Sequence, residues 1–310
     1  AIVLLANATM LMASPVEIVL DECPLTGATK RYSTSAAFDM NIDKEMDGFI
    51  ALCTALGNVK KISLSKCGLG PASMGELAKA VSSAGASLTS LCCGSNPIKD
   101  EGMAVLLDAV KDVALIEFDI AKTEIGPPTA KKLAEVLSDA TPFTASIKVV
   151  NLSECPLTGA TNNWGTWENI DSDMTGFIAL CGVLGKLHEI NLSDCGLGPT
   201  SAAELGKAIS SADASIATIN ISQSKIGVEG GQAIVEALKT TTLESIVIGN
   251  DLTLQLKGEL ESDSFDASGQ SIDPGYAMIM AWWLTTPVTA SLTSLCCGSN
   301  PGMVGELNAY

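Results

Sequence analysis

The segment VKKISLSKCGL, residues 59–69, decides the fold of this 310-residue chain. Apolar residues stand at its first, fourth, sixth and eleventh positions, and a cysteine stands at the ninth. Neighbouring residues of a β-strand point to opposite faces, so the centre of the segment predicts a strand with one buried side. The same arrangement returns as LHEINLSDCGL at residues 187–197 and as IKVVNLSECPL at residues 147–157.

Copies of this pattern run along nearly the whole chain, and most are followed by a helical pattern such as GPASMGELAKAVSSA from Gly70. Each copy, together with the helical pattern after it, therefore predicts one repeat made of a strand, a turn and a helix. A longer period of 128 to 132 residues relates the first four starts to the next four, which indicates that a four-repeat block was duplicated. The ten starts are Pro15, Val59, Leu88, Leu115, Ile147, Leu187, Ile216, Leu243, Ser262 and Leu292.

The pattern L-x-x-L-x-L-x-x-C/N-x-L resembles that of the leucine-rich repeat family, in its longer ribonuclease-inhibitor-like class, and is similar to the tandem arrays of many unicellular eukaryotes. The resemblance implies an α/β solenoid of about ten repeats, curved like a horseshoe, with a parallel sheet on the concave side and helices on the convex side. We expect residues 1–310 to form one such domain, with loop insertions near residues 28–46 and 160–174.

The two ends of the sequence also fit repeats. The apolar start AIVLLANATM is similar to AIVEALKTTT at residues 233–242, so we interpret it as the helix of a preceding unit. The chain stops at Tyr310 inside the expected helix of its last unit. With no polar cap at either end, the sequence is expected to be an excerpt of a longer array or to have covered ends.

The amino-acid composition restricts the kinds of molecule that this chain can bind. There are 18 Lys and Arg against 35 Asp and Glu, a net charge of -17, and Arg31 is the only arginine. Such a surface repels nucleic-acid phosphates and anionic lipid headgroups, and it attracts basic proteins. No run of apolar residues is long enough to span a bilayer. We therefore expect a protein partner, preferably basic, with no nucleic acid and no membrane insertion.

The ten cysteines occupy positions set by the repeat. The stretch SLTSLCCGSNP occurs at residues 87–97 and again at 291–301, and strand alternation places Cys93 and Cys297 in the core and Cys92 and Cys296 on the open side. Two alternatives remain: Cys92 is a reactive surface thiol, or Cys155 and Cys195 form a disulfide bond. Cysteines that pack by repeat position favour reduced thiols and an intracellular, reducing compartment, most simply the cytoplasm.

Two acidic segments resemble part of a calcium-binding loop. DKEMDGFI at residues 43–50 and DSDMTGFI at residues 171–178 match the first eight positions of an EF-hand loop, yet the twelfth position is Thr54 or Gly182 instead of glutamate. We prefer the interpretation that Asp47 and Thr175 cap the helices that follow. Weak cation binding is the alternative.

The sequence contains no set of residues that would support enzymatic catalysis. His188 is the only histidine, which excludes a His-based triad or a multi-histidine metal site, and no phosphate-binding or zinc-protease motif is present. We therefore expect no catalytic activity, no metal and no cofactor.

Candidate partner-binding residues fall in two groups. Strand positions three, five and seven should project from the concave sheet, and the two inserts gather aromatic residues at the edge of the sheet. The rings of the inserts either bind a partner or fold back over the array. A further aromatic cluster, MIMAWWL at residues 278–284, is expected to be a core-facing helix. The candidates are Glu117, Asp119, Asn151, Glu189, Asn191 and Asn220 on the sheet, and Tyr32, Phe38, Trp164 and Trp167 in the inserts.

The function expected from these features is a non-enzymatic scaffold for protein–protein interaction. The alternatives are a structural subunit of a larger assembly, an inhibitor of a basic enzyme, and a GTPase activator of the Ran type, which is built on similar repeats.

Overall fold

A computed structural model describes residues 16–31, 38–84, 87–211 and 215–304 of the chain. These residues divide into two compact units, residues 1–155 and 156–310, and each unit is described by itself. In both units a strand follows each predicted start, and a helix lies between most successive strands.

The first unit alternates strands and helices. Its strands are β1 (Val16–Val19), β2 (Val59–Ser63), β3 (Ser90–Cys92), β4 (Glu117–Asp119) and β5 (Val149–Asn151). Its helices are α2 (Asp47–Thr54), α3 (Pro71–Ala84), α4 (Lys99–Val110), α5 (Pro127–Ser138) and the short α6 (Pro142–Ser146), with a 3₁₀ turn η1 at Leu56–Asn58.

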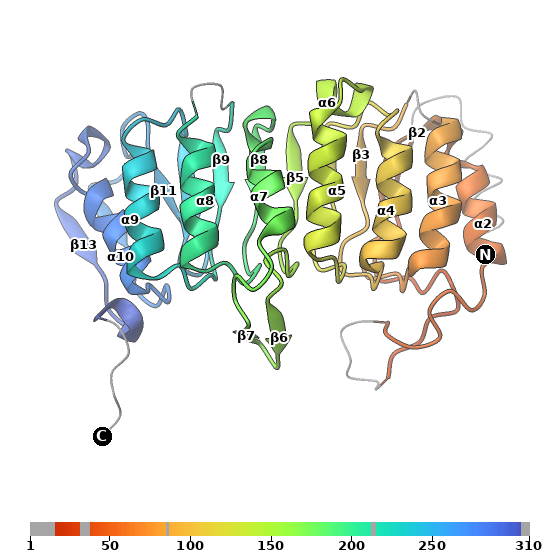
Figure 1. Cartoon of the computed structure of the whole chain (residues 1–310), viewed down its shortest axis with the longest axis horizontal. Helices are drawn as coiled ribbons and strands as arrows, with labels where there is room; N and C mark the ends of the chain where they lie inside the picture. Colours follow the sequence, from red (N-terminus) through yellow and green to blue (C-terminus); the bar gives the residue numbers. More distant parts are fainter. Residues whose placement is uncertain (1–15, 32–37, 85–86, 212–214, 305–310) are drawn as a thin grey trace. The chain divides into compact units, whose positions relative to one another are not determined.

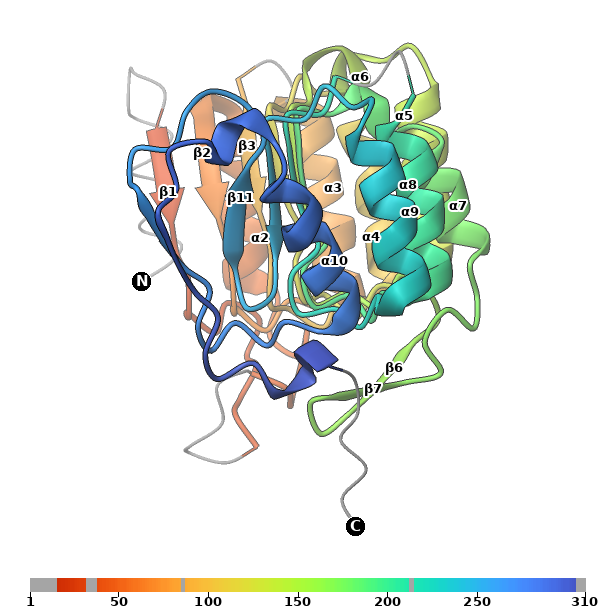
Figure 2. The same cartoon turned by 90° about the vertical axis from the view of Figure 1, so that its left-hand side faces the viewer.

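Parallel pairing joins the strands of the first unit in chain order, from β1 to β5. The register sets equal repeat positions side by side, as Ser63 with Cys92 and Cys92 with Asp119. Figures 1 and 2 show the helices on one side of these strands, which leaves the other side open. In either unit we call the side of the strands away from the helices the open face of that unit. The predicted parallel sheet with alternating helices is confirmed within the first unit.

The second unit begins with a hairpin that the sequence did not predict. It is formed by β6 (Thr161–Asn163) and β7 (Thr166–Glu168), and Figure 1 shows it projecting beyond the ends of the neighbouring helices. The unit continues with α7 (Thr175–Cys181), the 3₁₀ turn η2 (Leu184–Lys186), β8 (Glu189–Asn191), α8 (Pro199–Ile209), β9 (Thr218–Asn220), α9 (Gly227–Leu238) and β10 (Ser245–Ile248).

Strand pairing changes after β10. Strands β8, β9 and β10 are parallel, but β11 (Leu252–Gln255) folds back antiparallel onto β10. The copies of the pattern that start at Ser262 and Leu292 form a separate two-stranded parallel sheet, β12 (Ser264–Asp266) with β13 (Ser294–Cys296). The expectation of one parallel sheet through all repeats is therefore wrong here, because β11 occupies the edge of β10 and β12 pairs with β13.

The remaining elements cover this end of the unit. They are α10 (Pro274–Trp283) and the 3₁₀ turns η3 (Pro287–Thr289) and η4 (Pro301–Val304). Trp283 is buried, donates from its indole Nε1 to Gln255 O at 2.7 Å, and lies with its ring centroid 4.6 Å from that of Phe265. The predicted core-facing role of MIMAWWL is thus confirmed for Ile279, Met280 and Trp283.

Burial follows the eleven-position pattern. In the segment that starts at Val59, the first, fourth, sixth, ninth and eleventh residues are fully buried: Val59, Ile62, Leu64, Cys67 and Leu69. Each of these apolar side chains contributes roughly 1.5–3 kcal/mol by leaving water. Because each repeat packs only against the repeats before and after it, this core is shared between successive repeats.

Asparagine at position nine holds neighbouring turns together. Asn96 donates from Nδ2 to Leu64 O and Cys93 O, both at 2.8 Å, and its Oδ1 accepts from Cys67 N at 2.8 Å. Asn300, in the second copy of SLTSLCCGSNP, likewise donates to Ala267 O at 2.7 Å. Asn96 and Asn300 thus hold the backbone of the turn that leaves the strand, and the two identical stretches share this structural task.

Among the helices of the described residues, none combines the length and the apolar character needed to cross a membrane.

Candidate protein-interaction surfaces

The open face carries the strand candidates, and most of them already hold hydrogen bonds within the protein. In each of three repeats the side-chain Oδ1 at position five accepts from the backbone N–H two residues later, at 3.1 Å for Asn151, 3.0 Å for Asn191 and 2.9 Å for Asn220. Asp119 accepts from Ala121 N in the same way at 3.0 Å. These are Asx turns that end the strands, so four candidates have a structural task that the sequence did not reveal.

The two glutamates at position three differ from that group. Glu117 is exposed, and its carboxylate accepts from Ser90 Oγ at 3.0 Å on the adjacent strand. Glu189, in the second unit, is also exposed. Both carboxylates are available to a partner at the open face.

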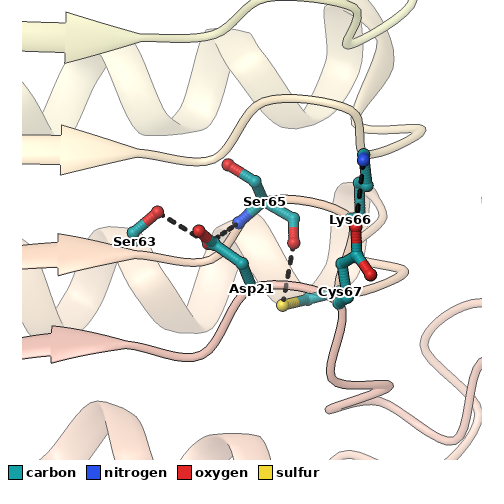
Figure 3. Close-up of polar contacts among 6 residues, drawn as sticks. Asp21, Ser63, Ser65, Lys66 and Cys67 are labelled. Atoms are coloured by element: carbon teal, nitrogen blue, oxygen red, sulfur yellow. Dashed lines mark hydrogen bonds and ion pairs between the residues drawn. The ribbon is translucent and has the colours of Figure 1, made fainter.

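Side chains also connect the strand ends from one repeat to the next. Asp21 accepts from Ser63 Oγ at 2.6 Å and from Ser65 N at 2.8 Å, as Figure 3 shows. Lys66 forms an ion pair with Glu22 at 3.0 Å beside this contact. Position eight holds a left-handed residue in these repeats, with φ of 61° at Glu22 and 54° at Lys66, which turns its side chain out at the edge of the sheet.

The insert of the first unit packs back through Phe38. This residue is half-buried, its Cβ comes within 3.1 Å of where a Cβ on Gly68 would lie, and Lys30 Nζ is 5.2 Å from the ring centroid. Tyr32 lies outside the described residues. For Phe38, the structure therefore favours the alternative in which the ring folds over the turn of the next repeat.

A hollow of about 480 Å³ opens beside Phe38. Asn96 and Pro97 contribute to its wall, and charged residues stand around it. Lys122 pairs with Glu154, and Glu124 contributes an exposed carboxylate. The charged residues lining the hollow are Asp39, Lys66, Lys122, Glu124 and Glu154, three acids and two bases.

The insert of the second unit separates its two tryptophans. Trp167 is half-buried and donates from Nε1 to Asp194 Oδ1 at 2.6 Å, with its ring against Gly196. Trp164 is 100% exposed at the tip of the β6–β7 hairpin. Thus one ring of the predicted pair folds back and the other stands in water.

The hairpin tip is a two-residue turn whose central residues are both left-handed, with φ of 52° at Trp164 and 84° at Gly165. This matches a type I′ turn, in which asparagine usually takes the first central place. Asn162 Oδ1 accepts from Gly165 N at 2.8 Å and supports the turn. Tryptophan at this place gave no hairpin signal in the sequence, which is why the hairpin was not predicted.

The acidic segments that resemble calcium loops bind backbone N–H groups instead. Asp43 accepts from Gly70 N at 3.1 Å, Ala72 N at 2.8 Å and Ser73 N at 3.2 Å, so it caps helix α3 of the following repeat. Asp171 makes the equivalent bonds to the start of α8, at 2.8 Å from Thr200 N. A carboxylate at a helix N-terminus also complements the helix dipole.

The predicted caps of the shorter helices were wrong. Asp47 and Thr175 are the first residues of α2 and α7, and neither helix has a side-chain bond from its N-cap residue, Met46 or Met174. Asp173 instead accepts from Thr175 N at 3.1 Å and from its hydroxyl at 2.6 Å, and these bonds lower the pKa of Asp173.

Cysteines occupy the predicted faces with one correction. All ten are free thiols; Cys93 is buried, and Cys92 is half-buried with Ser65 Oγ 3.0 Å from its sulfur. Burial, and next the nearby Asp119 carboxylate, raise the pKa of Cys92, which disfavours the reactive thiolate. Cys297, predicted to be core, is only half-buried because its sheet has two strands. Within the described residues, no group of three His, Cys, Asp or Glu side chains is placed to hold a metal ion.

Comparisons with known proteins give no family and no function for this chain. No family model matches the chain, and no curated protein matches it. Among the solved structures it is similar to the crystal structure of the Rad7 and Elc1 complex in yeast, at 11% identity, over 82% of this chain and 73% of that chain, with a TM-score of 0.29. A likeness at this level does not assign a function.

Proposed function

We propose that this chain is a non-enzymatic scaffold for protein–protein interaction, of the leucine-rich-repeat type in its ribonuclease-inhibitor-like class. We propose further that its partner binds at the inserts near residues 28–46 and 160–174. The observation that carries the proposal is the complete exposure of Trp164 on a hairpin whose base is fixed by Trp167. Tryptophan is among the residues that dominate binding at interfaces.

The physical argument concerns the free energy that Trp164 leaves unused. A tryptophan side chain can bury on the order of 200 Å², worth roughly 5 kcal/mol at 25 cal/mol per Å² before the costs of association. The ordered turn presents the ring without a loop having to be immobilised on binding, which lowers those costs. Trp164 therefore suits an anchor that enters an apolar hollow of the partner.

A basic partner fits the charges. The chain carries a net charge of -17, and the hollow beside Phe38 has one more acid than bases. Opposite charge speeds encounter and selects among partners more than it adds affinity. An inhibitor of a basic enzyme and a structural subunit would both use such a surface, and they remain the alternative forms of this proposal.

The proposal also includes that the chain has no catalytic activity and that it lies in a reducing compartment. The sole histidine, His188, is exposed, and burial raises the pKa values of Cys53 and Cys67 to about 12, which makes these thiols poor nucleophiles. An intracellular location agrees with ten unbridged cysteines.

Affinity capture with the tagged full-length chain tests the proposal. Proteins captured by the wild type and lost with Trp164→Ala are identified by mass spectrometry, and the purified partner is then titrated against both forms. We expect the dissociation constant to rise about 30-fold or more, as for a contact worth 2 kcal/mol. Ile116→Ala, which trims another exposed apolar side chain, is the matched control and should leave binding unchanged.

Two outcomes contradict the proposal. Equal affinity of the wild type and Trp164→Ala for every captured partner would remove the insert edge as the contact. Faster GTP hydrolysis by a small GTPase on addition of the chain would favour the Ran-type alternative, whereas we expect the rate to be unchanged.

A further inference from the structure

The helical side of each unit has a hollow beside a short helix. In the first unit, α2 has 8 residues and its neighbour α3 has 14; in the second unit, α7 has 7 and α8 has 11. Where the shorter helix ends, the flank of the longer one stays uncovered. The hollows measure about 400 Å³ in the first unit and 500 Å³ in the second.

The two hollows are built from equivalent residues of the duplicated block. Every residue that lines the first has a counterpart 128 positions later that lines the second, and seven of the eight pairs are identical. The exception is Thr54, which corresponds to Gly182. The identical pairs are Ile50 and Ile178, Cys53 and Cys181, Gly57 and Gly185, Glu76 and Glu204, Lys79 and Lys207, Ala80 and Ala208, and Ser83 and Ser211.

The open face of the same block has changed instead. In the two repeats of the block that start at Val59 and Leu88, one of the six pairs at strand positions three, five and seven is identical. The pairs are Lys61 and Glu189, Ser63 and Asn191, Ser65 and Ser193, Ser90 and Thr218, Cys92 and Asn220, and Gly94 and Ser222. After the duplication, the open face was therefore free to diverge while the hollows were retained.

Packing does not explain the retention at every position. Cys53 and Cys181 are buried in both copies, but Ile50 is 38% exposed and Ile178 is 48% exposed. Lys79 and its counterpart Lys207 are also exposed. A single exposed isoleucine is common on protein surfaces, so the exposed fraction alone does not indicate a contact. The support for a contact is that the exposed isoleucine and lysine return in both copies together with the rest of the lining.

The charged residues around each hollow indicate which molecule binds there. Each hollow has one acid and one base a helical turn apart, Glu76 with Lys79 at 2.7 Å and Glu204 with Lys207 at 2.6 Å; the second also has Lys186. The hollows are therefore within one charge of neutral on a chain of net charge -17. Two copies of so acidic a chain repel each other at most surfaces, and least where acids and bases balance.

Such an acid–base pair is also complementary to itself. Under a two-fold axis the same patch meets itself, so that the acid of one copy faces the base of the other. Glu76 of one copy would then face Lys79 of the second, with the exposed Ile50 of each filling the hollow of the other. We propose that these hollows are self-association sites, each occupied by a second copy of this chain in a two-fold contact.

Sedimentation of the full-length chain over a dilution series tests this inference. The wild type is expected to exceed the monomer mass of 31.9 kDa. The double variant Ile50→Glu with Ile178→Glu is expected to sediment as a monomer, with association weakened at least about 10-fold. Val105→Glu with Val228→Glu places the same charges at exposed apolar sites on α4 and α9, and this control should keep the wild-type mass. Circular dichroism of each variant verifies its folding.

A charge-reversal experiment tests the two-fold geometry itself. One variant carries Lys79→Glu and Lys207→Glu, and the other carries Glu76→Lys and Glu204→Lys. Each alone should be monomeric because like charges meet, and an equal mixture should recover the associated mass because every acid again meets a base. A monomeric wild type, an unchanged mass for the Ile50 and Ile178 variant, or a mixture that stays monomeric would each overturn the inference.

Discussion

Trp167 donates a hydrogen bond from its indole Nε1 to Asp194 Oδ1 at 2.6 Å, across 27 residues of sequence. The same ring covers Gly196, where a Cβ would lie 3.0 Å from Cε3 of the indole. One contact thus fixes the insert to the turn of the next repeat and leaves Trp164 as the part that projects.

Removing the Trp167 ring is expected to destabilise the second unit. Trp167→Ala loses the hydrogen bond and the packing on Gly196, and because the ring is half-buried we expect a loss of roughly 2–3 kcal/mol in the free energy of unfolding. Trp167→Phe keeps part of the packing and should lose less. Urea denaturation followed by circular dichroism measures both, and equal stability of the alanine variant and the wild type would show that the insert is not held by this ring.

Trp164→Asn is expected to leave stability unchanged or to raise it. The residue is fully exposed and left-handed, a conformation that costs most side chains roughly 1 kcal/mol and that asparagine tolerates. The gain should therefore not exceed about 1 kcal/mol in the same urea experiment. A clear loss of stability would mean that the indole packs on the protein, and it would weaken Trp164 as a binding anchor.

Asp43 and Asp171 are expected to act as helix caps and not as calcium ligands. Asp171→Ala removes an acceptor for three N–H groups at the start of α8 and should cost about 1–2 kcal/mol. Addition of calcium or of a chelator should leave the melting temperature of the wild type unchanged. A rise in melting temperature with calcium that disappears in Asp171→Ala would instead support the weak cation site.

Asn96→Ala is expected to be among the most damaging single substitutions. It removes hydrogen bonds to buried backbone groups of two neighbouring turns, among them Leu64 O and Cys67 N, and should cost roughly 3 kcal/mol or more. Asn300→Ala removes equivalent bonds in the half-exposed two-stranded sheet and should cost less, because water can replace them. The reverse order of the two losses would contradict this account.

Buried thiols are expected to make the protein less stable in alkali. Burial is the main reason why the pKa values of Cys53, Cys67 and Cys181 rise from 9.0 to about 12, so the folded state holds these protons more tightly than the unfolded state. Their contribution is complete below pH 9 and is lost as the pH rises from 9 towards 12, at up to about 1.4 kcal/mol per pH unit for each thiol.

Urea denaturation between pH 7 and pH 10 checks the direction of this dependence. The free energy of unfolding should be steady with respect to these thiols up to about pH 9 and should then fall. A thiol reagent at pH 8 gives an independent readout, since the exposed Cys23 and Cys296 should react first and the buried cysteines only after unfolding. Fast reaction of Cys53 or Cys181 in the folded protein would contradict the burial that raises their pKa values.

The repeat pattern alone determined where the strands lie and which residues are buried. This was possible because position in the eleven-residue pattern fixes the environment of a side chain wherever repeats stack on both sides, as for the buried Ile62 and Leu64. In the two-stranded sheet Leu295 has the same position as Ile62 and is 39% exposed. The pattern also marked position nine as asparagine or cysteine, and the structure shows why a short side chain stands there: Asn96 reaches backbone groups that the turn leaves unpaired.

Only the tertiary structure decided what happens between repeats and where the pattern stops. The carboxylate of Asp43 caps a helix 28 residues away, a bond between repeats that the local sequence does not specify. Strand β11 turns back onto β10 because the left-handed Gly249 and Asp251 reverse the chain, which a period of apolar residues cannot predict.

The candidate surfaces divide in the same way. Sequence named the aromatic inserts, but the exposure of Trp164 and the burial of part of Trp167 follow from a turn and a contact that form only in the folded chain. It also named the asparagines of the open face without showing that their Oδ1 atoms end strands. The hollows beside Ile50 and Ile178 arise from the unequal lengths of packed helices, because a groove is a property of two neighbours and not of either sequence alone.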